Sequence, residues 1–153
     1  MSEIVLDQEK LDNILSGLPF TLNEQQLSFI VKFITMGGNW CLNSEGGVGK
    51  SCIMLILKRY YEDEIVFFSS SGVSSLNMPE GISSGTTHSG LSLSIKMSTE
   101  YDHRKISSKC SALFASSDLI KIIVIDEAFS HNADNLDLIH RRIQRFNKRT
   151  GKR

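Results

Sequence analysis

One segment combines glycines with a lysine and a serine, and it reads Ser44-Glu45-Gly46-Gly47-Val48-Gly49-Lys50-Ser51. Its glycines let the backbone curl so that successive N–H groups point at phosphate oxygens. Lys50 would reach the β- and γ-phosphates of a nucleotide, and the Ser51 hydroxyl would bind Mg²⁺. The usual pattern begins with Gly, where this chain has Ser44. The segment predicts a phosphate site formed by Gly46, Gly47, Val48, Gly49, Lys50 and Ser51, and the alternative is a glycine-rich turn before a helix.

A pair of carboxylates, Asp126 and Glu127, follows the apolar, β-branched run Ile122-Ile123-Val124-Ile125. Such a run predicts a strand buried on both faces, which would deliver both carboxylates to its C-terminal end. Asp126 would hold Mg²⁺, directly or through water, and Glu127 would orient and deprotonate an attacking water. We therefore expect Lys50, Asp126 and Glu127 to form the catalytic set. The alternative is an exposed carboxylate pair without a catalytic role.

Both motifs need strands and helices to position them, and hydrophobic spacing predicts these elements. Two helical faces precede the loop, at Leu11, Ile14, Leu15 and Leu18, and at Leu27, Ile30, Val31 and Ile34. Asn23 would cap the second of these helices, and Gly37-Gly38 would end it. A buried helix is expected at 50–61, because its residues are apolar on most sides.

Short apolar segments predict strands at 39–43, 65–69 and 122–125. The Ser- and Gly-rich stretch 69–98 should be mostly loop, and the polar segment 97–109 should be the least ordered. A last helix would place four apolar side chains on one face, Leu136, Ile139, Ile143 and Phe146. Strands that alternate with helices indicate an α/β fold with a parallel sheet.

Composition places the chain among globular proteins. Its 153 residues suggest one domain, and 41% hydrophobic with 22% charged residues argues against strongly disordered classes. The longest apolar run, 52–57, is far shorter than the ~18 residues that span a bilayer, and the first residues do not form a signal-peptide pattern. Three widely spaced cysteines fit reduced thiols. We expect an intracellular protein without a membrane partner; nucleus, mitochondrion and a virus-infected host cell are not distinguished.

Charge is unevenly distributed, although the net charge is zero. Residues 141–153 hold seven basic groups and no acidic one, whereas the other 140 residues hold ten basic and seventeen acidic groups. The fold as a whole is therefore not a basic nucleic-acid binder, but its end has the charge for such a role. A solvated basic tail is the alternative.

Four blocks, in order, resemble the PIF-type ATP-dependent DNA helicases, a superfamily-one group that moves from 5′ to 3′. Leu22-Asn23-Glu24-Gln25-Gln26 is similar to the family's adenine-reading Q motif, and the phosphate loop follows. Residues 69–77, Ser-Ser-Ser-Gly-Val-Ser-Ser-Leu-Asn, resemble its Ala-Pro-Thr-Gly-x-Ala-Ala block. Gly85-Thr86-Thr87-His88-Ser89 is similar to its Thr-Ile-His-Ser block, and Asp126-Glu127 with residues 136–143 resembles its Asp-Glu block and the next helix.

The resemblance covers roughly residues 18–146 and implies a RecA-like P-loop NTPase fold that uses ATP and Mg²⁺. It implies that Gln26 reads adenine, and that the partner is single-stranded DNA or a duplex with a 5′ overhang. The residues implied to contact DNA are Ser71, Gly72, Thr86 and His88. The organisation would be a helical lead-in at 1–19, a partial RecA-like domain at 20–146 and a basic tail at 147–153. The family's work includes DNA repair, recombination and replication.

Two parts of the family pattern have no counterpart in these 153 residues: the Gly-Asp-x-x-Gln-Leu block and the second RecA-like domain with its arginine. In RecA-like folds of this class, the strand of that block lies between the P-loop strand and the Asp-Glu strand. We therefore expect an incomplete parallel sheet, slow ATP hydrolysis and no unwinding by the chain alone. A fragment, a truncated gene product or a decayed copy would fit, with a second RecA-like domain as the missing partner.

Two other functions stay open at this point. One is a small non-helicase P-loop protein, such as a nucleotide-binding regulator or a kinase-like transferase. The other is a non-catalytic module that holds DNA or a partner helicase domain with its basic end. ATP hydrolysis stimulated by single-stranded DNA favours the helicase, phosphorylation of a small acceptor favours the second function, and nucleotide-independent DNA binding favours the third.

Overall fold

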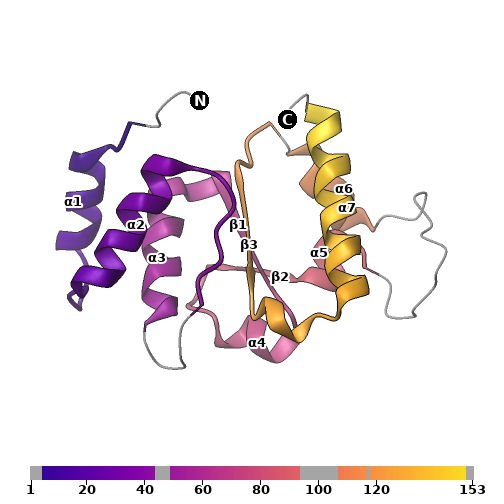
Figure 1. Ribbon diagram of the computed structural model, residues 1–153, viewed down its shortest axis with the longest axis horizontal. Helices are drawn as coiled ribbons and strands as arrows, with labels where there is room; N and C mark the ends of the chain where they lie inside the picture. Colours follow the sequence, from indigo (N-terminus) through magenta and orange to yellow (C-terminus); the bar gives the residue numbers. More distant parts are fainter. Residues whose placement is uncertain (1–4, 44–48, 94–106, 117, 151–153) are drawn as a thin grey trace. The chain divides into compact units, whose positions relative to one another are not determined.

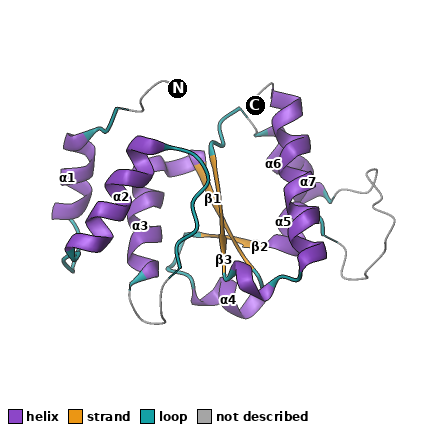
Figure 2. Cartoon of the chain, viewed as in Figure 1, coloured by secondary structure: helices purple, strands orange, loops and turns teal. Residues whose placement is uncertain are grey.

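The computed structural model of the chain describes residues 5–43, 49–93, 107–116 and 118–150. The chain divides into two compact units, residues 1–62 and 63–153, which Figure 1 colours along the sequence. The first unit is helical, and the second holds a sheet with helices around it (Figure 2). Among the described residues, no helix combines the length and the apolar character needed to cross a bilayer.

Three helices form the first unit: α1 (Gln8–Ser16), α2 (Glu24–Met36) and α3 (Lys50–Tyr61). Both α1 and α2 contact α3. The apolar faces predicted from spacing pack in part, because Leu27 of the predicted α2 face is 38% exposed. The buried residues of the three helices are Leu11, Ile30, Ile34, Ile53, Met54, Ile56 and Leu57. The predicted N-cap of α2 is confirmed, because the Asn23 side chain accepts a hydrogen bond from the backbone N–H of Gln26.

The strand predicted at 39–43 is wrong, because these residues have no regular secondary structure. A strand needs a neighbour for its backbone hydrogen bonds, and no described strand pairs with this segment. The Trp40 side chain instead packs on the rings of Phe29 and Phe33 of α2, and its Nε1 donates to the carbonyl oxygen of Gly37 at 2.8 Å. The segment that leads into the phosphate loop is therefore anchored to a helix.

The second unit is built on a parallel sheet of three strands, β1 (Ile65–Ser69), β2 (Ser83–Thr86) and β3 (Ile122–Asp126), in the order β2-β1-β3. This arrangement confirms the predicted α/β class and fits a partial RecA-like P-loop fold. The register pairs Ser69 with Asp126, so β1 and β3 end side by side. Parallel strands present their carboxyl ends at one edge, and all three strands here end at residues that the sequence placed in candidate sites or next to them.

The stretch 69–98 is more ordered than its composition predicts. It holds α4 (Gly72–Asn77), β2 and α5 (Thr87–Leu91). The Ser71 hydroxyl accepts from the N–H of Ser74 at the start of α4, and the Thr86 hydroxyl accepts from the N–H of Ser89 at the start of α5. Small hydroxyl residues therefore act here as helix caps, although the same residue types suggest loops when they are counted by composition. Residues 97–106 of the segment predicted to be least ordered lie outside the described residues.

The helices α5, α6 (Ser108–Ala115) and α7 (Ala133–Thr150) lie together beside the sheet (Figure 1). Short 3₁₀ turns occupy η1 (Glu62–Glu64) and η2 (Ala128–Ser130). The core of this unit joins the sheet to α5 and α7 through four buried side chains, Phe68, Leu91, Leu93 and Ile139. Gly90 allows α5 to approach β1, because a Cβ at that position would overlap the Phe68 ring.

The burial predicted for β3 is wrong. All five residues of β3 are only half-buried, because β3 is an edge strand with a described neighbour on its β1 side only. Central β1 is the well-buried strand instead. Ile139 and Ile143 of the face predicted for α7 pack on the core, together with Leu138. Leu136 of the same face is 44% exposed, and the side chain of Phe146 lies outside the described residues.

The basic end of the chain is partly used by the fold. Helix α7 continues to Thr150, so the predicted basic tail at 147–153 begins inside a helix. Arg142 is only 2% exposed and donates from Nη2 to the carbonyl oxygen of Ser92 at 3.2 Å. Arg141 pairs with Asp137 one turn away at 2.7 Å. These two arginines therefore contribute packing and pairing within the second unit.

Candidate nucleotide and nucleic-acid site

The described part of the phosphate loop begins at Gly49, directly before α3. Gly49 has φ 86° and ψ 26°, a left-handed conformation that glycine adopts without the steric cost of a Cβ. Gly49, the N-cap of α3, has no side chain that could bond the first N–H groups of the helix, and a helix start of this kind is where anions bind. Lys50 and Ser51 are the first two residues of that helix. Gly46, Gly47 and Val48 of the predicted site lie outside the described residues.

Gln26 lies against the loop, although it belongs to a different helix. Its side-chain nitrogen Nε2 is so close to Gly49 that a Cβ on that glycine would overlap it. Its other amide atom, Oε1, accepts from the backbone N–H of Asn23 at 3.0 Å and completes a capping box. The structure therefore brings together two blocks that the sequence assigned to one nucleotide site. It also shows that the Oε1 atom of the Gln26 amide is already bonded at the start of α2.

Asp126 and Glu127 stand at the carboxyl end of β3, where the sequence placed them. Asp126 is half-buried as the last strand residue, and Glu127 is exposed in the turn that follows. Glu127 has φ 53° and ψ 41°, in the left-handed region. A non-glycine residue there costs about 1–3 kcal/mol, and such strain concentrates at functional sites.

Two serine hydroxyls reach the Glu127 carboxylate from the segment after β1. Ser70 Oγ donates to Glu127 Oε2 at 3.2 Å, and Ser74 Oγ donates to the same oxygen. The resemblance assigned Ser71 and Gly72 of this block to DNA, and sequence reasoning missed the contact of Ser70 and Ser74 with Glu127. A signal was present: the resembling block has Pro at position 70 and Ala at position 74, and neither residue can donate a side-chain hydrogen bond.

The candidate DNA residues sit at the starts of α4 and α5. Ser71 is exposed and uses its hydroxyl to cap α4, and Gly72 is the first residue of that helix. Thr86 caps α5, and His88 follows in its first turn, half-buried. Because α4 follows β1 and α5 follows β2, these residues belong to the same edge of the parallel sheet as Asp126.

His131 is a residue that sequence reasoning missed. Its Nε2 lies 3.0 Å from the hydroxyl of Thr87, which donates to the carbonyl oxygen of Ser69 at 3.3 Å. Burial lowers the pKa of His131 below its usual value, and the neighbouring His88, with ring centroids 5.9 Å apart, lowers it further. No local motif identifies His131, because its partners Thr87 and His88 come from α5, more than forty residues earlier.

The family model for PIF1-like helicases matches residues 21–152 of this chain. The chain belongs to the PIF1-like helicase family. No curated protein and no solved structure matches it. Membership confirms the predicted resemblance and indicates a helicase-type function. Nucleotide hydrolysis is the general activity of this family. The match begins just before Asn23 and Gln26 and includes every candidate residue up to Glu127.

The donor atoms of this PIF1-like chain fit Mg²⁺. Ser51 in the first unit offers a hydroxyl oxygen, and Asp126 in the second offers a carboxylate, both of which are hard ligands. Among the described residues, no group of three or more His, Cys, Asp or Glu side chains gathers in a way that could hold a metal ion.

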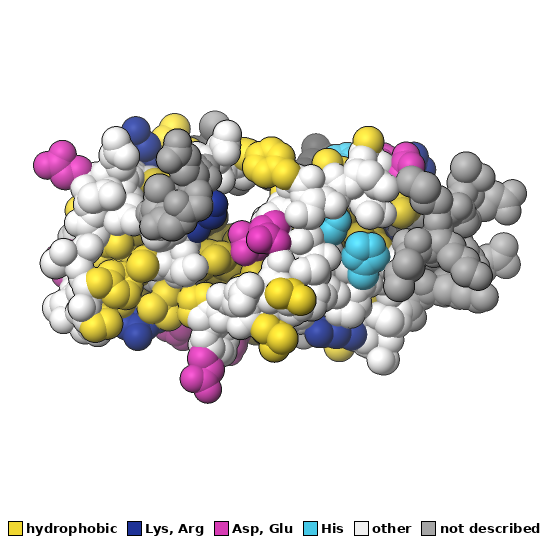
Figure 3. All heavy atoms as spheres, turned by 90° about the horizontal axis from the view of Figure 1, so that it is seen from below, with side chains coloured by type: hydrophobic (Ala, Val, Ile, Leu, Met, Phe, Trp, Pro, Cys, Tyr) yellow, Lys and Arg dark blue, Asp and Glu magenta, His cyan; other side chains and the backbone are white. Residues whose placement is uncertain are grey.

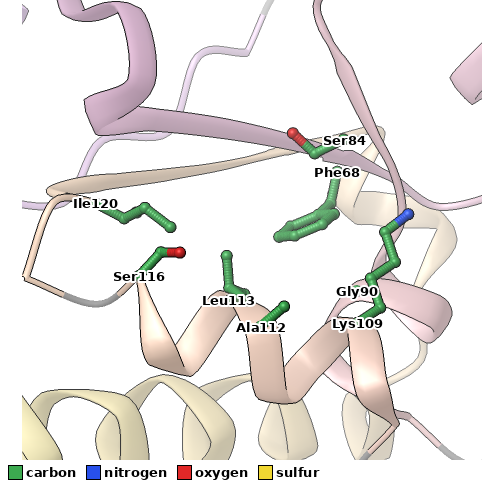
Figure 4. Close-up of a pocket in the computed structure, with 8 residues that line it drawn as sticks. All are labelled: Phe68, Ser84, Gly90, Lys109, Ala112, Leu113, Ser116 and Ile120. Carbon is green, nitrogen blue, oxygen red and sulfur yellow. The ribbon is translucent and has the colours of Figure 1, made fainter.

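A separate pocket of about 200 Å³ lies in the second unit of this helicase-family chain, between the sheet and α6 (Figure 4). Phe68 and Ser84 line it from the sheet, and Ala112 and Leu113 line it from α6. None of the predicted site residues lines this pocket. Its walls are mainly apolar, so we assign it to imperfect packing of α6 rather than to the nucleotide site.

Proposed function

We propose that this chain is the nucleotide-binding part of an ATP-dependent DNA helicase. The observation that carries the proposal is the contact of Gln26 with Gly49 at the start of α3. It joins an amide able to recognise a base with a helix start able to bind phosphates, although the two are separate in sequence. ATP with Mg²⁺ is therefore the ligand that we propose for residues 46–51.

The proposed roles follow from the position of each side chain. Lys50 and the N–H groups of the first turn of α3 bind the β- and γ-phosphates. Ser51 and Asp126 would hold Mg²⁺, which neutralises charge on the phosphates when bound. Glu127 orients a water and accepts its proton as the water oxygen bonds to the γ-phosphorus and the bond to the β-phosphate oxygen breaks.

The proposed DNA contacts lie at the edge of the second unit's sheet. Ser71 and Gly72 start α4, while Thr86 and His88 start α5, so helix-start backbone N–H groups and a histidine are grouped where the strands end. Such groups bind phosphate oxygens without reading sequence. The protons of the Ser71 and Thr86 hydroxyls are used within the protein, by Ser74 and Ser89. We propose single-stranded DNA or a duplex with a 5′ overhang as the partner, an intracellular location, and work in repair, recombination or replication.

The deciding experiment measures binding of ATP with Mg²⁺ by calorimetry, in the native chain and in Lys50→Ala. We expect the substitution to weaken affinity about 10- to 100-fold, because charge-assisted hydrogen bonds to phosphate contribute roughly 1.5–3 kcal/mol. Arg59→Ala is the matched control, since it removes a cation from the last turn of the same helix. Equal affinity in native and Lys50→Ala chains contradicts the proposal.

Hydrolysis assays then separate the three functions. Stimulation by single-stranded DNA supports the helicase assignment, transfer of phosphate to a small acceptor supports a kinase-like protein, and DNA binding without any nucleotide effect supports a binding module. We expect hydrolysis to be slow and strand displacement on a 5′-overhang duplex to be absent. In the PIF-type helicases a second RecA-like domain supplies an arginine, and such an arginine accelerates related reactions roughly 10³- to 10⁵-fold.

A further inference from the structure

We propose that Ser70 and Ser74 are positioning residues for Glu127, which they hold in one orientation at the end of β3. The proposal rests on the proposed function, because it assigns a purpose to the residue that handles the attacking water. Three features of the second unit carry it: the direction of the hydrogen bonds, the backbone of Glu127 and the free side of its carboxylate.

The direction of the hydrogen bonds follows from counting protons. An ionised carboxylate only accepts hydrogen bonds, so Ser74 Oγ donates its single proton to Glu127 Oε2. Ser74 Oγ also lies 2.9 Å from Ser71 Oγ, and that bond must therefore run from Ser71 to Ser74. Ser71 Oγ in turn accepts from the backbone N–H of Ser74 at 3.1 Å. The start of α4 thus directs an ordered series of donors at the carboxylate.

The backbone of Glu127 turns its side chain toward those donors. Its φ of 53° is unfavourable for a residue with a Cβ. The turn is closed by η2, where the N–H of Ser130 donates to the carbonyl oxygen of Glu127 at 2.9 Å. An exposed glutamate normally samples many rotamers, and fixing it costs side-chain entropy. Two charge-assisted hydrogen bonds are of the size needed to offset that cost.

Both serine hydroxyls bind the same oxygen, Oε2 of Glu127. Within the described part of the chain, no hydrogen bond reaches Oε1, and Glu127 is exposed. One carboxylate oxygen is therefore fixed to the protein while the other is presented to solvent. That is the arrangement a residue needs if it is to place one water reproducibly.

The first test measures coupling between Ser74 and Glu127 without any nucleotide. Urea unfolding is compared for the native chain, Ser74→Ala, Glu127→Ala and the double variant. We expect Ser74→Ala to lower the folding equilibrium constant about fivefold when Glu127 is present and to have less effect in the Glu127→Ala background. The Ser71–Ser74 bond is lost in both backgrounds and cancels. Alanine also has a Cβ, so the strain of the left-handed backbone at position 127 is present in all four chains.

Ser75→Ala is the matched control for this test. Ser75 is the next residue of α4, and its hydroxyl bonds the hydroxyl of Ser83 on β2 rather than Glu127. Its effect on folding should be the same with Glu127 and with Glu127→Ala. An equal effect of Ser74→Ala in the two backgrounds overturns the proposed contact.

The second test measures single-turnover ATP hydrolysis together with nucleotide affinity. We expect Ser74→Ala, and Ser70→Ala combined with it, to slow hydrolysis roughly tenfold while affinity is unchanged, since positioning rather than binding is lost. Ser74→Thr keeps the hydroxyl and should restore most of the rate. A rate for Ser74→Ala equal to that of Ser75→Ala overturns the positioning role. If the native chain hydrolyses ATP no faster than the uncatalysed background, the proposed function is contradicted instead. The urea experiment then still decides whether Ser74 and Glu127 are coupled.

Discussion

The side-chain nitrogen of Gln26 lies against the α-carbon of Gly49, so closely that a methyl group on the glycine would overlap it. The contact joins the first turn of α2 to the residue before α3. It places the candidate base-reading amide beside the candidate phosphate site. It also makes a side chain at position 49 unfavourable, because the backbone there is left-handed and the Gln26 amide would have to move.

Replacing Gly49 with alanine should destabilise the chain by more than backbone strain alone. The matched control is Gly38→Ala, because Gly38 has the same φ of 86° but no atom within 4 Å of the place that a Cβ would take. We expect Gly38→Ala to cost about 1–2 kcal/mol, and Gly49→Ala to cost about 1–3 kcal/mol more, through overlap with Gln26. Urea denaturation of both variants measures the difference. Equal costs would show that Gln26 moves aside freely.

Gln26 should contribute both to the start of α2 and to base selection, and two substitutions separate these roles. Gln26→Glu keeps an oxygen for the Asn23 N–H but loses the amide NH₂, whereas Gln26→Ala loses both. We expect the preference for ATP over GTP to shrink in both variants. Stability should fall, by about 1 kcal/mol, only in the alanine variant. An unchanged preference in both, measured by competition binding, would leave Gln26 with a helix-capping role alone.

Glu127→Gln should leave nucleotide binding intact and lower hydrolysis about 10²- to 10⁴-fold, the usual contribution of a general base. The amide keeps the shape of the side chain and still offers an oxygen to Ser70 and Ser74. Calorimetry with ATP and a phosphate-release assay measure the two effects separately. If affinity falls together with the rate, Glu127 supports the structure rather than the reaction.

His131 should make the folded state less stable in acid. Its pKa in the folded state is lowered, first by burial and then by His88, whereas an unfolded histidine titrates near 6.5. Below about pH 6.5 the unfolded chain therefore binds more protons at this position, so stability falls as the pH falls and is fully present above that value. Unfolding at pH 7.5 and at pH 5.5 should show a smaller decrease in His131→Gln than in the native chain. An identical decrease would assign the acid sensitivity to other groups.

Apolar side chains are exposed on the second unit around α4 and η2. Val73 and Leu76 of α4 are 70% and 85% exposed, and Phe129 of η2 is 79% exposed. Figure 3, which views the molecule from below, shows such yellow apolar side chains at the surface among polar ones. Singly exposed apolar residues are common on soluble proteins, so these three carry no functional assignment.

The amino-acid sequence alone determined those parts whose signals are local. Helical spacing and the cap at Asn23 located α1, α2 and α3, and the apolar runs located β1 and β3. The Gly-Lys-Ser and Asp-Glu motifs were also readable, because their residue types and neighbours carry the chemistry. In each case the deciding interactions act within a few residues along the chain.

Only the tertiary structure decided the rest, because those features depend on residues far apart in sequence. Residues 39–43 have strand-like composition but no pairing partner in the described residues, so Trp40 anchors them to α2 instead. The half-burial of β3 reflects its place at the sheet edge. The bonds of Ser70 and Ser74 to Glu127 span more than fifty residues. Hydrogen-bond partners and burial are set by where segments meet, and periodicity along the chain carries no information about that meeting.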